Sequence, residues 1–253
     1  VDKPNMAQKG TISVEKTGEV FFGVNVSGEE DEDVIYQPVY KVKGLAGAVY
    51  EITADEDVIT PDGTLRYHKG DVVDTVTTDE DGTAKSKELY LGKYNVVETK
   101  APTGMVINKE KHLVELTYAG QDVAVTETAT SFVNERQKVK ISLEKILEQD
   151  EIFGIGKNNE IKNISFGLYA KEDVVSSSGT VIPADGLIEI ITLDENEAAT
   201  ANTDLPFGSY YIKEIATDEH YILSDIQYPF TFKYAGQDTE TVEIKVNDGK
   251  PIE

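Results

Sequence analysis

The sequence of 253 residues contains no cysteine and no tryptophan, and it has only three histidines. Without cysteine, a disulfide, a thiolate nucleophile and a cysteine-based metal site are all excluded. The three imidazoles, His68, His112 and His220, fall in no Ser/His/Asp or metal-ligand arrangement. We therefore expect no enzyme that turns over a substrate, no cofactor and no metal.

Long apolar runs and positive charge are also scarce. No run approaches the roughly 18 residues of a membrane-spanning helix, and Val1 does not begin a signal peptide, so the sequence reads as a segment excised from a longer protein. Lys and Arg number 24 against 47 Asp and Glu, for a formal net charge of −23. This balance argues against nucleic acid and anionic membranes as partners, and it favours a soluble, self-repelling surface. We expect a monomer.

An internal repeat organises the chain. The pentapeptide YAGQD occurs at 118–122 and at 234–238, and its separation of 116 residues is also that of Glu98 and Glu214. The pentapeptides ISVEK and ISLEK end at Lys16 and Lys145, 129 residues apart, so the first copy holds about 13 more residues. We expect two tandem domains, residues 1–136 and 137–253, with the extra segment at about 20–43 of the first. The tetrapeptides at 47–50 and 166–169 are also expected to correspond.

Both copies have the pattern of all-β domains. Short runs rich in Val, Ile, Thr and Tyr are separated by turn signals such as those at 61–63, 79–82 and 101–104, and helix-period patterning is weak. Such regular spacing favours Greek-key β-sandwiches or partly open barrels. In the first copy, strands are expected at 11–16, 34–42, 48–54, 72–77, 93–99, 112–118 and 123–134.

In each copy the strand pattern predicts a glutamate whose carboxyl group points into the hydrophobic core. Side chains alternate along a strand, so Glu98 shares a face with Tyr94 and Val96. In the second copy Glu214 similarly follows Tyr210 and Ile212 on one face. A buried carboxyl is costly, so each glutamate must find a partner or be held protonated.

These segments resemble a known family, the B-type repeat of Gram-positive collagen adhesins (CnaB) and the SpaA-type, prealbumin-like pilin domain. The resemblance is carried twice and in order by ISVEK and ISLEK, LAGAVYEI and ISFGLYA, then LGKYNVVETKAPTGM and PFGSYYIKEIATDEHYIL, with SFVN closing the first copy. It implies a tandem pair of prealbumin-like Greek-key β-sandwiches. It also implies, in each domain, an isopeptide bond between a first-strand lysine and a last-strand asparagine, formed beside a catalytic glutamate.

In the first domain the implied residues are Lys16, Asn134 and the catalytic Glu98. The strand phase agrees, since Lys16 shares a face with Ile12 and Val14. Burial lowers the pKa of a lysine, and a neutral amine is a nucleophile. A protonated glutamic acid can bind the asparagine carbonyl oxygen and pass a proton to departing ammonia. Alternatively, Lys16 reaches solvent at the domain end, Glu98 pairs with it, and the asparagine occupies a linker turn.

The second domain departs from this pattern at the acceptor. Lys145 and Glu214 are in place, but Asn247 is out of phase with Val246 and precedes an Asp-Gly turn. Matching residues 131–134 to the C-terminal end places the acceptor one position beyond Glu253, and this segment would then leave the second bond open. Asn247 is the alternative, if a bulge shifts the phase.

The resemblance predicts a structural stalk or spacer in an extracellular, cell-wall-attached adhesin or pilus subunit. Its partners would be the neighbouring domains of the same parent protein. The alternative is a ligand-binding adhesin module for host protein or polysaccharide, using exposed tyrosines; the candidates are Tyr36, Tyr40, Tyr50, Tyr67, Tyr90 and Tyr94.

Three acidic segments resemble calcium sites only loosely. Thr77, Asp79, Asp81 and Glu88 have EF-hand-like spacing, but the first ligand is threonine and no helices flank the segment. We expect a hairpin turn there, and solvated loop tips at 29–33 and 194–197.

Overall fold

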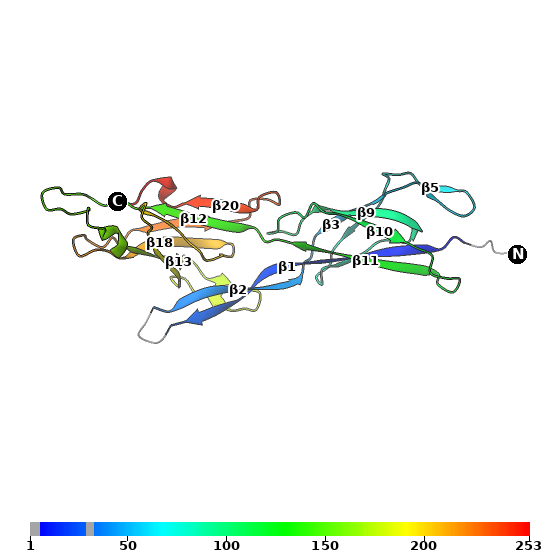
Figure 1. Ribbon diagram of the computed structural model, residues 1–253. Helices are drawn as coiled ribbons and strands as arrows, with labels where there is room; N and C mark the ends of the chain where they lie inside the picture. Colours follow the sequence, from blue (N-terminus) through cyan, green and yellow to red (C-terminus); the bar gives the residue numbers. More distant parts are fainter. Residues whose placement is uncertain (1–5, 29–32) are drawn as a thin grey trace. The chain divides into compact units, whose positions relative to one another are not determined.

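The computed structural model describes residues 6–28 and 33–253 (Figure 1). Strands dominate it, and the all-β prediction is confirmed. Two short 3-10 helices, η1 (Glu160–Asn163) and η2 (Val246–Gly249), interrupt the strands. Within the described ranges, no helix has the length and apolar character needed to cross a lipid bilayer.

The chain forms two compact units. Unit 1 comprises the described residues of Val1–Glu19, Val42–Arg136 and Gly236–Asp238; unit 2 comprises those of Val20–Lys41, Gln137–Ala235 and Thr239–Glu253. The segment expected as an insertion of the first domain therefore groups with unit 2. The segment groups with unit 2 because three of its side chains, Phe21, Val24 and Tyr36, pack against the unit 2 core.

Unit 1 is built around a four-stranded antiparallel sheet and the long first strand. The sheet has the order β10 (Lys111–Leu116), β9 (Gly92–Lys100), β3 (Val49–Ala54) and β6 (Val72–Thr77). Opposite it, β1 (Lys9–Ser27) pairs in parallel with β11 (Val125–Asn134) and antiparallel with β7 (Thr83–Lys85) and β8 (Leu89–Tyr90). A small hairpin joins β4 (Val58–Ile59) and β5 (Leu65–Tyr67). Figure 1 shows β1 and β11 side by side, so the first and last strands of the repeat run together.

Unit 2 repeats this arrangement. Here β12 (Lys138–Glu144) pairs in parallel with β20 (Thr241–Lys245) and antiparallel with β17 (Ala198–Thr200). The facing sheet has the order β16 (Leu187–Thr192), β13 (Ser165–Ala170), β18 (Gly208–Ala216) and β19 (Gln227–Phe232), and β2 (Ile35–Gly44) pairs with β16. A short hairpin joins β14 (Val174–Val175) and β15 (Val181–Ile182).

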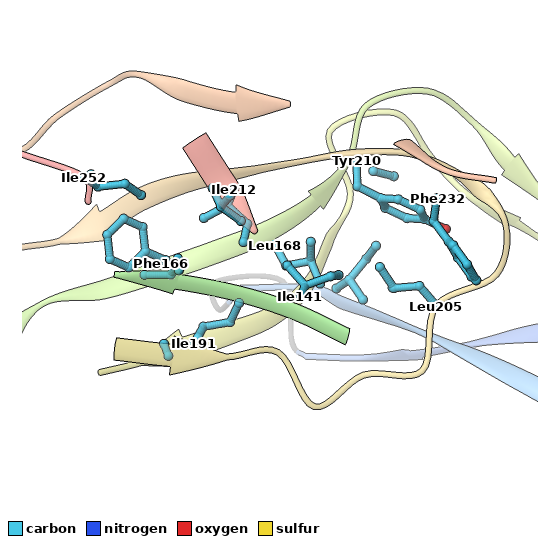
Figure 2. Close-up of a cluster of buried hydrophobic side chains, with 14 of the residues drawn as sticks. Ile141, Phe166, Leu168, Ile191, Leu205, Tyr210, Ile212, Phe232 and Ile252 are labelled. Carbon is cyan, nitrogen blue, oxygen red and sulfur yellow. The ribbon is translucent and has the colours of Figure 1, made fainter. Parts of the chain in front are cut away.

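The two hydrophobic cores follow from period-two alternation. In β9 the residues Tyr94, Val96 and Glu98 are all buried, as the sequence pattern predicted. Unit 2 buries the corresponding set on β18, and Figure 2 shows Tyr210 and Ile212 pointing into a core that also contains Phe166, Leu168 and Phe232.

Strand by strand, the units keep the 116-residue spacing. The pairs β3 and β13, β9 and β18, and β10 and β19 begin at 49 and 165, 92 and 208, and 111 and 227. One expected correspondence differs, because Tyr50 lies opposite Glu98 whereas Phe166 lies opposite Glu214. Tyr50 therefore corresponds to Phe166 and not to Tyr169.

Candidate functional site

In unit 1 the strand register brings a lysine, a glutamate and an asparagine to one buried point. Lys16 continues the inward face of β1, and its side chain is fully buried. Parallel pairing sets Lys16 beside Phe132 on β11, two residues before Asn134. Glu98 comes from β9 and Asn134 ends β11, and both are buried as well. The structure thus brings together all three residues expected in the first domain.

The three side chains contact one another directly. The Lys16 Nζ donates to Asn134 Oδ1 and lies 3.3 Å from Glu98 Oε1. Asn134 Nδ2 donates to both carboxylate oxygens of Glu98, at 3.0 and 3.1 Å. The backbone N–H of Asn108 donates to Glu98 Oε2 at 2.7 Å. The glutamate therefore touches both nitrogens that an amide transfer between Lys16 and Asn134 would involve.

Hydrophobic walls set the electrostatics of this site. The rings of Tyr50 and Phe132 lie 4.8 Å apart, with the Lys16 Nζ 6.0 and 5.8 Å from their centres. Burial lowers the pKa of Lys16, against the opposing effect of the Glu98 charge and hydrogen bond. Desolvation of the ammonium thus outweighs its ion pair and shifts the balance towards the neutral amine, which is the nucleophilic form.

One contact differs from the expected arrangement. Glu98 was expected to bind the carbonyl oxygen of Asn134, but it accepts hydrogen bonds from the amide nitrogen instead. The carbonyl oxygen faces Lys16. In this orientation the carboxyl group lies beside the nitrogen that would depart as ammonia, which suits it to deliver a proton there.

Unit 2 contains the lysine and the glutamate of a matching site. Lys145 and Glu214 are buried, and Lys145 Nζ lies 3.5 Å from Glu214 Oε2. That oxygen makes no hydrogen bond in the part of the chain that the structure describes. Asn247 lies in η2 with a positive φ of 57°, and its Nδ2 donates to the carbonyl oxygens of Lys250 and Pro251 at 3.2 Å each. Its side chain is therefore engaged within its own turn.

The strand register identifies which residues of unit 2 correspond to the end of β11. In unit 1, Ile12 pairs with Thr128 and Lys16 with Phe132, four residues further on along both strands. In unit 2, Ile141 pairs with Ile244, but Lys145 pairs with Ile252, eight residues further along the second strand. The turn at Val246–Gly249 accounts for the difference. Ile252 thus corresponds to Phe132.

The acidic loops act as turns. Asp79 Oδ1 accepts the N–H groups of Asp81 and Thr83 at 3.1 and 2.9 Å, and its hydrogen bonds with Thr83 lower the pKa of Asp79. Asp194 makes the corresponding contacts in unit 2, with Asn196 and Ala198. Residues 29–32 of the acidic run lie outside the described residues. Within those residues, no group of three or more His, Asp or Glu side chains is placed to hold a metal ion.

The tyrosines proposed as a ligand-binding cluster lie largely inside the fold. Tyr50 and Tyr94 are fully buried, and the other four are half-buried. Tyr67 packs on Tyr90 and Tyr94, with ring centres 6.0 and 6.4 Å apart.

Two contributors to the site were missed from the sequence. Asn108 acts through its backbone, which no side-chain pattern reveals. Tyr50 was considered as a ligand contact or a core residue but not as part of the site, although alternation along 48–54 places it on the buried face with Ile52.

Comparison with known proteins assigns the class of this fold. The family model for the SpaA prealbumin-like fold domain matches residues 39–130 and 153–250. The chain therefore belongs to the SpaA prealbumin-like family, as the resemblance predicted, in two copies.

Among solved structures, the chain is similar to the TIE protein of Bacillus anthracis, at 20% identity and a TM-score of 0.54. The match covers 94% of this chain and 33% of that one, so the chain spans one third of that relative. A streptococcal ancillary pilin matches at 17% identity, covering 95% and 63% of the two chains with a TM-score of 0.30. The shaft pilin SpaA of Lactobacillus rhamnosus GG matches at 13% identity, 94% and 97% coverage and a TM-score of 0.30. No curated protein matches the sequence.

Proposed function

We propose that unit 1 closes an isopeptide bond between Lys16 and Asn134, with Glu98 as the catalytic residue. The observation that supports it most directly is the buried contact of the lysine amine, the asparagine amide and the glutamate carboxyl group. An ordinary structural ion pair does not need a carboxamide placed against the amine. The hydrophobic walls favour the neutral amine that an attack requires.

The reaction is a single amide transfer within the fold. Lys16 Nζ attacks Asn134 Cγ, and the Nζ–Cγ bond forms as the Cγ–Nδ2 bond breaks. The proton lost by Nζ passes through the Glu98 carboxyl group to Nδ2, which leaves as ammonia. The lysine and the asparagine are consumed, so the domain is both substrate and catalyst and has no turnover.

Intact-protein mass spectrometry under denaturing conditions tests this proposal. Residues 1–253 are expected to be lighter than the calculated mass by one ammonia. Lys16→Ala and Glu98→Ala should each restore the full mass expected for the variant. Lys9→Ala, on the same strand, is the matched control and should retain the loss. Full mass in the unsubstituted chain would refute the bond.

The cross-link suits a mechanical role. Lys16 and Asn134 are separated by 118 residues, so the bond encloses most of the chain of unit 1. Tension applied at the ends of unit 1 would pass through the covalent bond and largely bypass the core. We infer a stalk or spacer segment of a Gram-positive pilus subunit or wall-attached surface protein, extracellular and joined to neighbouring domains of its parent.

For unit 2 we propose that the acceptor is the residue that follows Glu253 in the parent protein. The correspondence of Ile252 with Phe132 supports this proposal, because Asn134 lies two residues after Phe132. Lys145 and Glu214 would then act as Lys16 and Glu98 do. A chain extended by one asparagine should lose a second ammonia, and Lys145→Ala should abolish only that second loss.

Ligand binding is a second candidate function, supported by one surface feature. A shallow pocket of unit 1 is lined by Lys9, Arg66 and Tyr90, with both cations over the tyrosine ring at 5.2 and 4.7 Å. Positive charge beside an aromatic ring suits an acidic polysaccharide. Calorimetric titration with an acidic oligosaccharide, repeated with Arg66→Ala, tests this role; equal heats for both chains would exclude it.

A further inference from the structure

One buried tyrosine faces the glutamate of the unit 1 site. Tyr50 is 0% exposed, and the pairing of β3 with β9 sets it directly opposite Glu98. Its hydroxyl oxygen is buried and makes no hydrogen bond in the described structure. A buried hydroxyl without a partner destabilises a fold relative to phenylalanine, which has the same ring and no polar atom. Packing alone therefore does not account for a tyrosine at this position.

The other fully buried tyrosines differ in this respect. The hydroxyl of Tyr94 donates to the carbonyl oxygen of Tyr90 at 2.5 Å, and that of Tyr210 donates to Pro206 at 2.7 Å. The fold thus provides acceptors for buried phenols elsewhere.

The second repeat shows that only the ring is needed at this position. Phe166 lies opposite Glu214 in the same register as Tyr50 opposite Glu98. Phe166 is fully buried, so a ring without a hydroxyl fills the equivalent place. The hydroxyl of Tyr50 is therefore an addition specific to the first site.

The Tyr50 hydroxyl and the Glu98 carboxyl group are near enough to interact. Burial raises the pKa of Tyr50, and Glu98 raises it further through its charge and through the closeness of its carboxyl group to the hydroxyl group. The phenol thus stays protonated and is a potential donor. The ionisable groups facing Glu98 are Lys16 from β1 and Tyr50 from β3, while His112 on β10 is stacked on the Phe132 ring.

We propose that Tyr50 is a positioning residue for the cross-link, whose hydroxyl donates to the Glu98 carboxylate as ammonia departs. This inference rests on the proposed function of the site. Before the reaction, both Glu98 oxygens accept hydrogen bonds from Asn134 Nδ2. Breaking the Cγ–Nδ2 bond removes those donors just as Glu98 gives up its proton and becomes a buried carboxylate. The Tyr50 O–H then replaces a lost donor and stabilises the charge.

The test compares the rate of closure with folding and stability. The full chain is isolated unreacted from inclusion bodies in urea and diluted into refolding buffer. Folding is followed by circular dichroism, and ammonia loss by mass spectrometry of acid-quenched samples. Tyr50→Phe should fold at the unsubstituted rate but close about tenfold more slowly, the effect expected from losing one hydrogen bond to a charged group.

Tyr94→Phe is the matched control, since it removes a buried hydroxyl of the same unit away from Glu98. It should leave the closure rate of folded molecules unchanged. Lys16→Ala prevents closure of the bond. In that background Tyr50→Phe should not lower the melting temperature, because the Tyr50 hydroxyl group makes no hydrogen bond in the unreacted site.

The outcomes separate this inference from the proposed function. Equal closure rates for Tyr50→Phe and the unsubstituted chain would overturn the role of Tyr50 while leaving the bond in place. A slower closure matched by an equally slower folding would also overturn it, since the hydroxyl would then act through the fold. Absence of ammonia loss from the unsubstituted chain would refute the proposed function itself.

Discussion

Removing the lysine of the first site should lower the thermal stability of unit 1 by a calculable amount. Lys16→Met keeps an unbranched, apolar side chain of similar length but cannot form the bond. In the loop-entropy model, closing the 118-residue separation of Lys16 and Asn134 stabilises the fold by about 5 kcal/mol. Unfolding entropy is about 2.1 cal/mol/K per residue, so this free energy corresponds to about 20 °C for a domain of about 120 residues.

Differential scanning calorimetry measures this shift. Because Lys16→Met also removes the buried amide N–H of the bond, whose desolvation is itself destabilising, the substitution alone can underestimate the bond. Glu98→Gln and Asn134→Ala remove the bond through different side chains, and the decrease common to all three variants isolates it. Lys145→Met is the matched control in unit 2, and it should leave the unit 1 transition in place. If all three unit 1 variants melt within two or three degrees of the unsubstituted chain, about a tenth of the predicted shift, the covalent account is wrong.

Three further predictions concern charge, the second site and force. In Asn134→Ala the amine stays free, and because burial lowers the pKa of Lys16 the unfolded chain binds more protons than the folded chain. The free energy of unfolding, measured with urea, should therefore rise with pH from that lowered pKa up to the ordinary value of 10.5. A flat profile would show that the amine is not desolvated. Asn247→Ala in residues 1–253 should leave the mass deficit unchanged at one ammonia, because only the first site closes. A deficit smaller by one ammonia than that of the unsubstituted chain would show that Asn247 is an acceptor. Under single-molecule force, the chain between Lys16 and Asn134 should not extend, whereas Lys16→Met should add the contour length of those residues; equal extensions would show that the bond carries no load.

Period-two alternation explains why the first site could be predicted from sequence. Alternation placed Lys16 with Ile12 and Val14, and Glu98 with Tyr94 and Val96; all six side chains are buried. Asn134 followed from its phase with Phe132. A parallel pairing of the first and last strands then brings these faces together. The sequence pattern predicted the faces, but the pairing itself came from the family resemblance.

The grouping of residues 20–41 was not predictable from the repeat. Spacing shows where one copy is longer, but it does not show on which core the added side chains pack. Phe21, Val24 and Tyr36 lie against the unit 2 core, which is a long-range contact that no local pattern encodes. The added residues also lengthen β1 far beyond the expected 11–16, to Ser27.

Contacts to backbone and amide atoms were also beyond sequence reasoning. The orientation of the Asn134 amide, with its nitrogen at Glu98, depends on the positions of both lysine and glutamate atoms. The four-residue turn at η2 was different, because the Asp-Gly signal and the lost phase at Asn247 both indicated it. The position of the turn could therefore be predicted from local sequence, whereas the orientation of side chains in a buried cluster could not.

The most direct measurement is a tryptic digest of the denatured chain, analysed by tandem mass spectrometry. Trypsin does not cleave after a lysine that is modified at Nζ, so the chain stays intact after Lys16. Residues 10–41 should therefore appear joined to residues 112–136 in one branched peptide, which is lighter by one ammonia than the sum of its two parts. Fragmentation should place the branch at Lys16 and Asn134. Recovery of residues 10–16 and 112–136 as separate, unmodified peptides would contradict the account.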